Sequence, residues 1–200
     1  MGLGRKLLAR RVREMGKGGA PDMCGWYAEH FQLLLADKND FAILHGYLDD
    51  IARCRMSDGF YDTQSVGRVA PARKGLKNKV RPLVVGDLAR KTCECALSEA
   101  KTPDLLRCLA PEQHAVGLTA AIEKYAHSVR CLVEATDDIA VGLLDCVSAY
   151  NNILREPVLE ECAEASKDIL AFMATFLCRK GRYVLYEDTG VAHIIESARV

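Results

Sequence analysis

The chain has 200 residues, half of them apolar, and its 27 Lys and Arg are balanced by 27 Asp and Glu. This composition is typical of a globular chain with a sizeable core, and it excludes a disordered or strongly basic protein. Residues 1–100 carry 17 basic and 12 acidic side chains, whereas residues 101–200 carry 10 and 15, so we expect the two halves to face different chemistry.

Nine cysteines, an odd number, are scattered along the chain, which predicts reduced thiols in a nuclear or cytoplasmic setting. Only Cys93 and Cys95 lie close together, and a Cys-x-Cys pair without a second pair is a weak zinc motif. No apolar run reaches about 18 residues and no secretory signal is present. We therefore expect a soluble intracellular protein with no membrane partner.

Three helices are predicted in the N-terminal third. Residues 3–15 form a basic amphipathic pattern, followed by a flexible break at 16–21. Residues 26–36 and 40–55 predict two more helices, the second with an N-cap at Asp40. Its expected buried face has helical spacing and comprises Phe41, Leu44, Leu48 and Ile51.

The last of these helices contains Tyr47-Leu48-Asp49-Asp50, which resembles the Tyr-x-Asp-Asp signature of reverse transcriptases. Helical geometry turns Asp49 and Asp50 away from the apolar stripe and toward water. The polymerase signature needs a tight β-hairpin downstream of the first catalytic aspartate. We therefore interpret this match as coincidental.

A basic β-hairpin is predicted next, with strands at residues 66–73 and 80–85 and a turn at 74–78. Pro71 and Pro82 each remove a ladder donor, so both strands should be edge-like or distorted. Such a ribbon suits a phosphate chain or a triphosphate, although a charged surface hairpin without a ligand is the commoner case. Eight basic residues lie in or beside it, against the single acid Asp87: Arg68, Arg73, Lys74, Lys77, Lys79, Arg81, Arg90 and Lys91.

Helices dominate the pattern after the hairpin. Residues 86–100 predict a helix that buries Leu88, Ala96 and Leu97. Another follows Gly117, with its inward face formed by Leu118, Ile122, Tyr125, Val129 and Leu132. Residues 157–177 predict one helix or two, with a break near Ser166 and Lys167. A second hairpin is predicted at residues 182–187 and 191–196.

The apolar run at residues 139–144 predicts a strand buried on both faces, and it ends in Asp145. A buried carboxylate needs a hydrogen-bonding partner, a counter-ion or a metal. An ordinary strand-to-helix connection is one interpretation. Phosphotransfer proteins are another, but a haloacid-type phosphatase needs a second Asp where Val147 stands, and a receiver domain needs an acidic pair after its first strand, which this chain lacks.

The order of four motifs favours a different interpretation. These are Lys74 with Val80-Arg81-Pro82-Leu83, then Pro111-x-Gln113-x-x-x-Gly117, then Leu144-Asp145-x-x-x-Ala149-Tyr150-Asn151, and finally a helix and a hairpin. Over about residues 40–200 this order resembles the first half of a reverse transcriptase (RNA-directed DNA polymerase) domain of the non-LTR retrotransposon type.

The resemblance implies roles for individual residues. Asp145 would be catalytic and would bind Mg²⁺ in a two-metal site. Arg81, and with it Lys74, would bind the incoming dNTP, and Tyr150 would close on its sugar. Contacts to the RNA template and DNA primer would come from a separate set, Arg73, Lys77, Lys79 and Gln113.

The implied fold class is α+β, with reverse-transcriptase-like fingers, a partial palm and a helical N-terminal region. Its expected divisions are a basic helical arm and linker at 1–20, the helical region at 21–64, fingers at 65–138 and the partial palm at 139–200. Two-metal nucleotidyl transfer needs carboxylates that hold ions about 3.5–4 Å apart. In the family the others come from an aromatic-x-Asp-Asp hairpin, which does not follow Asp145 here.

We therefore expect a truncated or partial nucleotidyltransferase that is inactive alone. The alternative is a non-catalytic, nucleic-acid-binding remnant of a retroelement.

Overall fold

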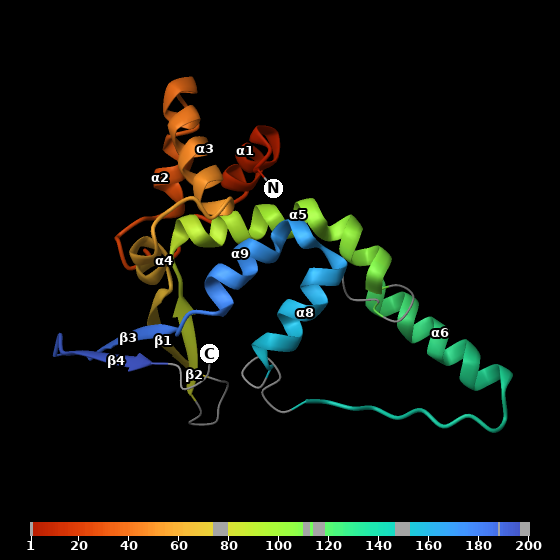
Figure 1. Ribbon diagram of the computed structural model, residues 1–200. Helices are drawn as coiled ribbons and strands as arrows, with labels where there is room; N and C mark the ends of the chain where they lie inside the picture. Colours follow the sequence, from red (N-terminus) through yellow and green to blue (C-terminus); the bar gives the residue numbers. More distant parts are fainter. Residues whose placement is uncertain are drawn as a thin grey trace. The chain divides into compact units, whose positions relative to one another are not determined.

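A computed structural model describes residues 2–73, 80–109, 113, 119–146, 153–187 and 189–196 (Figure 1). The chain divides into two compact units. The first unit comprises Met1–Glu99 and Lys167–Val200, and the second unit comprises Ala100–Ser166. Helices predominate and the described strands form one small sheet, so the predicted α+β class is confirmed.

Side chains that cap the helices fix two of the helix starts in the first unit. Asp37 accepts hydrogen bonds from the backbone N–H groups of Asn39 and Asp40, and Ser57 accepts one from Phe60. The predicted N-cap at Asp40 is therefore wrong by three positions, because Asp40 already lies in the first helical turn. The helices that open this unit are α1 (Arg5–Arg13), α2 (Ala28–Leu33), α3 (Lys38–Ala52) and α4 (Asp58–Gln64).

The core of the first unit joins these helices to α5 (Leu88–Leu109) and α9 (Lys167–Leu177). Leu44, Leu48 and Ile51 of α3 are buried in this core, as the helical spacing predicts, and Phe41 packs against its edge. Burial of Ala96 and Leu97 is confirmed as well. The remaining buried apolar side chains of the cluster are Leu3, Leu8, Val12, Phe31, Ala52, Tyr61, Ala89, Cys93, Phe172 and Phe176.

Two arginines fasten α9 to the earlier helices. The Arg90 guanidinium lies 4.2 Å from the centre of the Phe176 ring. Arg179, which follows α9, pairs with Asp58 and Asp62 of α4 and lies 5.7 Å from the Tyr61 ring centre. Cation–π and ionic contacts therefore supplement the apolar packing here.

The two predicted hairpins are both confirmed, and they share one four-stranded sheet in the order β2–β1–β3–β4 (Figure 1). β1 (Val66–Arg73) pairs with β2 (Val80–Val85), and β3 (Arg182–Tyr186) pairs with β4 (Ala192–Glu196), both antiparallel. β1 also runs parallel to β3. No sequence pattern predicts this long-range junction between the hairpins.

Both hairpin prolines occupy positions that tolerate a missing N–H. The parallel pairing of β1 with β3 ends at Val69, opposite Leu185, and Pro71 lies beyond it. Pro82 lies opposite Pro71 on β2, which is an edge strand. Each proline therefore faces at most one neighbouring strand, and the predicted edge-like positions are confirmed.

The second unit contains the C-terminal part of α5, then α6 (Ala121–Ala135) and α8 (Arg155–Ala165). α5 continues through Pro103, which has no N–H to donate to the carbonyl of Glu99, and the boundary between the units follows Glu99. The predicted break near Ser166 is confirmed, because α8 ends at Ala165 and α9 begins at Lys167.

The predicted helix after Gly117 forms as α6, but its predicted inward face is wrong. Ile122 is 81% exposed, and Tyr125 and Leu132 are exposed too. An amphipathic pattern sets the helical period but supplies no partner. Nothing in the described part of the second unit covers this face of α6.

All nine cysteines are free thiols, as expected. Cys93 is buried and donates its S–H to the Leu48 carbonyl at 3.3 Å, whereas Cys95 is exposed. The two therefore do not share one environment, and burial raises the pKa of Cys93. No helix within the described ranges is long and apolar enough to cross a membrane.

Candidate nucleic-acid interface

The basic hairpin is the first part of the candidate site. Antiparallel register places Arg81 opposite Ala72 and Arg73 opposite Val80, so the two arginines occupy neighbouring strands near the end of the hairpin. Lys74, Lys77 and Lys79 lie outside the described residues. The structure thus confirms the hairpin that carries these residues, while the contacts of the three lysines stay a prediction.

Two of the eight basic residues around the hairpin have structural roles instead. Arg68 is half-buried and donates to the Pro21 carbonyl at 3.2 Å. Arg90 pairs with Glu94 at 2.7 Å while it packs over Phe176. Lys91, on the same helix as Arg90, is exposed. Fewer of the eight basic residues are therefore available to contact nucleic acid than the sequence suggested.

Asp145 belongs to residues 139–146, a segment outside any helix or strand that follows α6 and the turn at Asp137. The prediction of a strand buried on both faces at residues 139–144 is wrong, because this segment forms no strand and Leu144 is 99% exposed. An apolar run becomes a buried strand only where a neighbouring strand pairs with it. The described sheet pairs β1 to β4 with one another and leaves this run without a partner.

The other predicted residues of this region are only partly described. Tyr150 lies outside the described residues. Gln113 is exposed, and its backbone N–H donates to the Leu109 carbonyl at 2.9 Å, just after α5. Arg81 belongs to the first unit, and Asp145 and Gln113 belong to the second.

The described residues do not fit a two-metal centre at Asp145. Among them, no three His, Cys, Asp or Glu side chains lie close enough together to hold a metal ion. A pair of Mg²⁺ ions needs several oxygen ligands, which one aspartate does not supply. We assign no catalytic step to metal ions in this part of the chain.

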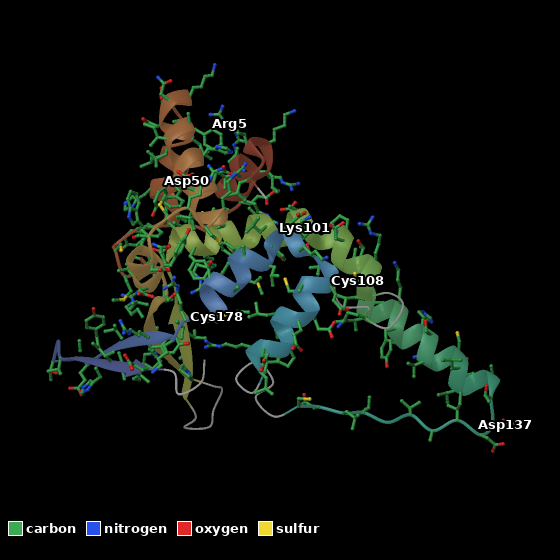
Figure 2. The ribbon with its side chains drawn as sticks, in the orientation of Figure 1. Arg5, Asp50, Lys101, Cys108, Asp137 and Cys178 are labelled. Atoms are coloured by element: carbon green, nitrogen blue, oxygen red, sulfur yellow. The ribbon has the colours of Figure 1, made fainter. Side chains whose placement is uncertain are left out.

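The Tyr-x-Asp-Asp match lies on α3 and serves the fold (Figure 2). Asp50 pairs with Arg55, and its side chain is 45% exposed, so it reaches water as predicted. The prediction that Asp49 faces water is wrong. Asp49 accepts hydrogen bonds from the Leu3 N–H at 2.6 Å and from Arg53 at 2.7 Å.

These contacts change the ionisation of Asp49. Burial by itself would raise the pKa of Asp49, but the hydrogen bonds from Leu3 and Arg53 outweigh it and lower the pKa. The ionised carboxylate therefore holds the N-terminal segment against α3. His45 completes the attachment through a hydrogen bond to the Leu3 carbonyl at 2.8 Å.

A pocket of about 440 Å³, which no motif predicted, lies in the first unit between α2, α3, α4 and the start of α5. We call it the acidic pocket. Its walls include Trp26, Tyr47 and Gln64, with the carboxylates of Asp22 and Asp87. These five residues come from four separate stretches of the chain and form no spaced motif, so no sequence pattern indicates the pocket.

No protein-family model matches the chain, and no curated protein matches it in sequence.

Proposed function

We propose that this chain is a part of an RNA-directed DNA polymerase of the non-LTR retrotransposon type. The observation that carries the proposal is a basic hairpin, formed by β1 and β2, that precedes Asp145 and Tyr150 in the order of the family's motifs. Formation of this hairpin with Arg81 on an edge strand supports a role in gripping phosphates. In the complete enzyme the reaction is template-directed, Mg²⁺-dependent nucleotidyl transfer.

Within this proposal the basic residues act on the substrates. Arg81 and Lys74 bind the triphosphate of the dNTP, and the lysines of the turn bind the phosphates of template and primer. Tyr150 lies against the sugar and disfavours a 2′-hydroxyl. Asp145 would hold metal ions only together with further carboxylates, and the bound ions would supply Lewis-acid chemistry there, so we expect these 200 residues not to catalyse the reaction alone.

The exposed apolar run before Asp145 supports the proposal that these residues belong to a larger sheet. Leu143 and Leu144 are almost fully exposed, and a run of this kind is stable in water only when it pairs and packs. The proposal requires residues 139–144 to gain a neighbouring strand in the complete polymerase. Pairing would also fix the position of Asp145.

The second candidate function is a nucleic-acid-binding remnant of a retroelement that has no catalysis. The observation that favours it is Asp145 itself, which has no cluster of metal ligands around it in the described residues. Both candidates bind nucleic acid through the β1–β2 hairpin. They differ in whether the chain recognises a deoxynucleotide.

The first experiment measures RNA affinity by filter binding across a salt series. Each phosphate contact contributes a slope of about −0.7 in log K against log salt for a single strand. A double variant, Lys77→Ala with Lys79→Ala, removes two residues expected to contact the phosphates of the nucleic acid and should therefore make the slope less steep by about 1.4. The matched control, Lys6→Ala with Arg13→Ala, removes two exposed charges from α1 and should leave the slope unchanged.

Two outcomes contradict the hairpin as the binding surface. One is binding that does not change with salt. The other is a slope that changes with the α1 pair and not with the hairpin pair.

The second experiment separates the two candidates by photo-crosslinking with 8-azido-dATP and 8-azido-ATP. The polymerase proposal predicts stronger labelling by the deoxynucleotide and loss of that preference in Tyr150→Ala. Equal labelling by both nucleotides, or no labelling, favours the remnant.

A further inference from the structure

The acidic pocket is lined by two buried carboxylates. Asp22 and Asp87 are both more than nine-tenths buried. In the described part of the chain, no Lys or Arg lies within ion-pair distance of either carboxylate. Buried carboxylates are normally paired with a cation. The described residues supply none here, so a ligand with a positive charge would stabilise the two carboxylates.

Neutral donors hold the two carboxylates in place. Oδ1 of Asp22 accepts from the N–H groups of Cys24 and Trp26, and its Oδ2 accepts from the Leu88 N–H. Oδ1 of Asp87 accepts from the Arg90 N–H. Each carboxylate offers about four acceptor positions, so both keep capacity for a further donor. The two lie close enough that the charge of Asp22 helps to raise the pKa of Asp87, after the larger effect of burial.

Gln64 supplies a third acceptor. Its side chain lines the pocket and is 6% exposed, and its Nε2 donates to Oδ2 of Asp87 at 2.8 Å. No described residue donates to its Oε1, which is buried. A buried amide oxygen without a donor costs about 1–3 kcal/mol. Such an acceptor beside two carboxylates is suited to a ligand that carries several N–H groups.

Aromatic rings form the apolar walls. Trp26 and Phe31 meet edge to face with ring centres 5.6 Å apart, and Tyr47 and Phe60 do so at 6.2 Å. Burial, with the nearby charge of Asp87, raises the pKa of Tyr47 to about 12, so its phenol stays neutral. Aromatic faces attract cations, and a flat guanidinium also stacks on them.

We propose that the acidic pocket binds a guanidinium group, whose N–H donors reach Gln64 and the two carboxylates while its faces lie against the aromatic rings. The pocket volume of about 440 Å³ holds an arginine side chain with its aliphatic stem. The guanidinium belongs either to a small free compound or to an arginine of a peptide partner. The inference does not depend on the polymerase function.

The chain has one tryptophan, and it lines the pocket, so its fluorescence reports occupancy directly. The experiment titrates the chain with Nα-acetyl-arginine amide and, as the neutral control of equal shape, with Nα-acetyl-citrulline amide. A saturable change with arginine and none with citrulline is expected. A Gly-Gly-Arg-Gly-Gly peptide that binds tighter than the blocked residue indicates a peptide partner, and equal binding indicates a small free compound.

Variants test the named contacts. Gln64→Leu removes the orphan acceptor and should weaken arginine binding by about tenfold, the weight of one charge-assisted hydrogen bond. Asp40→Asn, at the exposed rim of the pocket, preserves folding and should weaken binding about two- to threefold, in line with a screened charge. Its matched control is Asp50→Asn, which removes the same charge from the same helix outside the pocket and should leave affinity unchanged.

Three results overturn the inference. The first is an equal response to arginine and citrulline, which would assign the buried acids to helix and loop capping alone. The second is Trp26 fluorescence that neither compound changes. The third is an Asp50→Asn variant that weakens binding as much as Asp40→Asn does, which would place the cation outside the pocket.

Discussion

Asp87 has two separable roles in the ligand-free chain, and replacing it tests which one stabilises the fold. It caps the start of α5 through the Arg90 N–H at 2.8 Å, and it accepts from Gln64 at 2.8 Å. Asp87→Ala removes both contacts. Asp87→Asn keeps an oxygen for the cap, and its amide can pair with Gln64 once the Gln64 amide turns over.

The expected magnitudes differ clearly. Loss of an N-cap costs about 1 kcal/mol, and a buried amide left without a partner costs about 1–3 kcal/mol. Asp87→Ala should therefore lower the free energy of unfolding of the first unit by about 2–4 kcal/mol. Asp87→Asn exchanges one hydrogen bond for another and removes a buried charge, so it should lie within about 1 kcal/mol of the unchanged chain.

The pH dependence follows from the direction of the pKa shift. Burial is the main reason that the pKa of Asp87 in the folded chain lies above its ordinary value of 3.8. The folded state therefore binds the proton more tightly, and stability is fully present below pH 3.8 and is lost as pH rises through the raised pKa. Relative to the unchanged chain, Asp87→Asn should gain stability across that window.

Urea unfolding followed by Trp26 fluorescence measures these effects, because Trp26 and Asp87 lie in the same unit. Asp87→Asn and the unchanged chain should diverge as pH rises from 3.8. If Asp87→Asn is as destabilising as Asp87→Ala at neutral pH, the negative charge itself is needed, and the account of Asp87 as a costly charge is refuted.

Three further predictions concern the fold and the activity. Gly67→Ala should destabilise the sheet by about 1–3 kcal/mol in thermal unfolding, because the new Cβ would lie 2.4 Å from Cγ1 of Val84; Gly46→Ala on α3 meets nothing within 4 Å and should instead stabilise by about 0.5–1 kcal/mol. Gln32 donates to the carbonyls of Val12, Arg13 and Met15, so Gln32→Ala should lower amide-exchange protection in α1, and unchanged protection would contradict this role. Primer extension with Mg²⁺ should yield no product from these 200 residues alone; robust dNTP incorporation would show that the catalytic set is complete.

Local chemistry explains which elements the sequence predicts well. The stripe at Leu44, Leu48 and Ile51 predicts both the helix and its buried face, since the rest of the core lies against that face. The basic hairpin is predicted by two strand-like stretches and the turn between them, which are also local. The N-cap of α3 was misplaced because Asp37 and Asp40 have the same chemistry, and only backbone geometry separates them.

The other failures concern partners that are distant in the sequence. Residues 139–144 and the apolar face of α6 have patterns that fit burial, but burial needs a second surface that a local pattern does not specify. The union of β1 with β3 and the contact of Gln64 with Asp87 are missed for the same reason. The residues proposed to act on substrates come from motifs alone, and of these the structure describes only the strand positions of Arg73 and Arg81, and the exposure of Asp145 and Gln113.

Mapping UV crosslinks between the chain and an RNA template annealed to a DNA primer tests the central claim most directly. Mass spectrometry of the crosslinked peptides reports which residues contact the nucleic acid. The polymerase proposal predicts crosslinks in the hairpin at residues 66–85 and in the segment that contains Gln113. Crosslinks confined to α1, or none at either predicted segment, would contradict it.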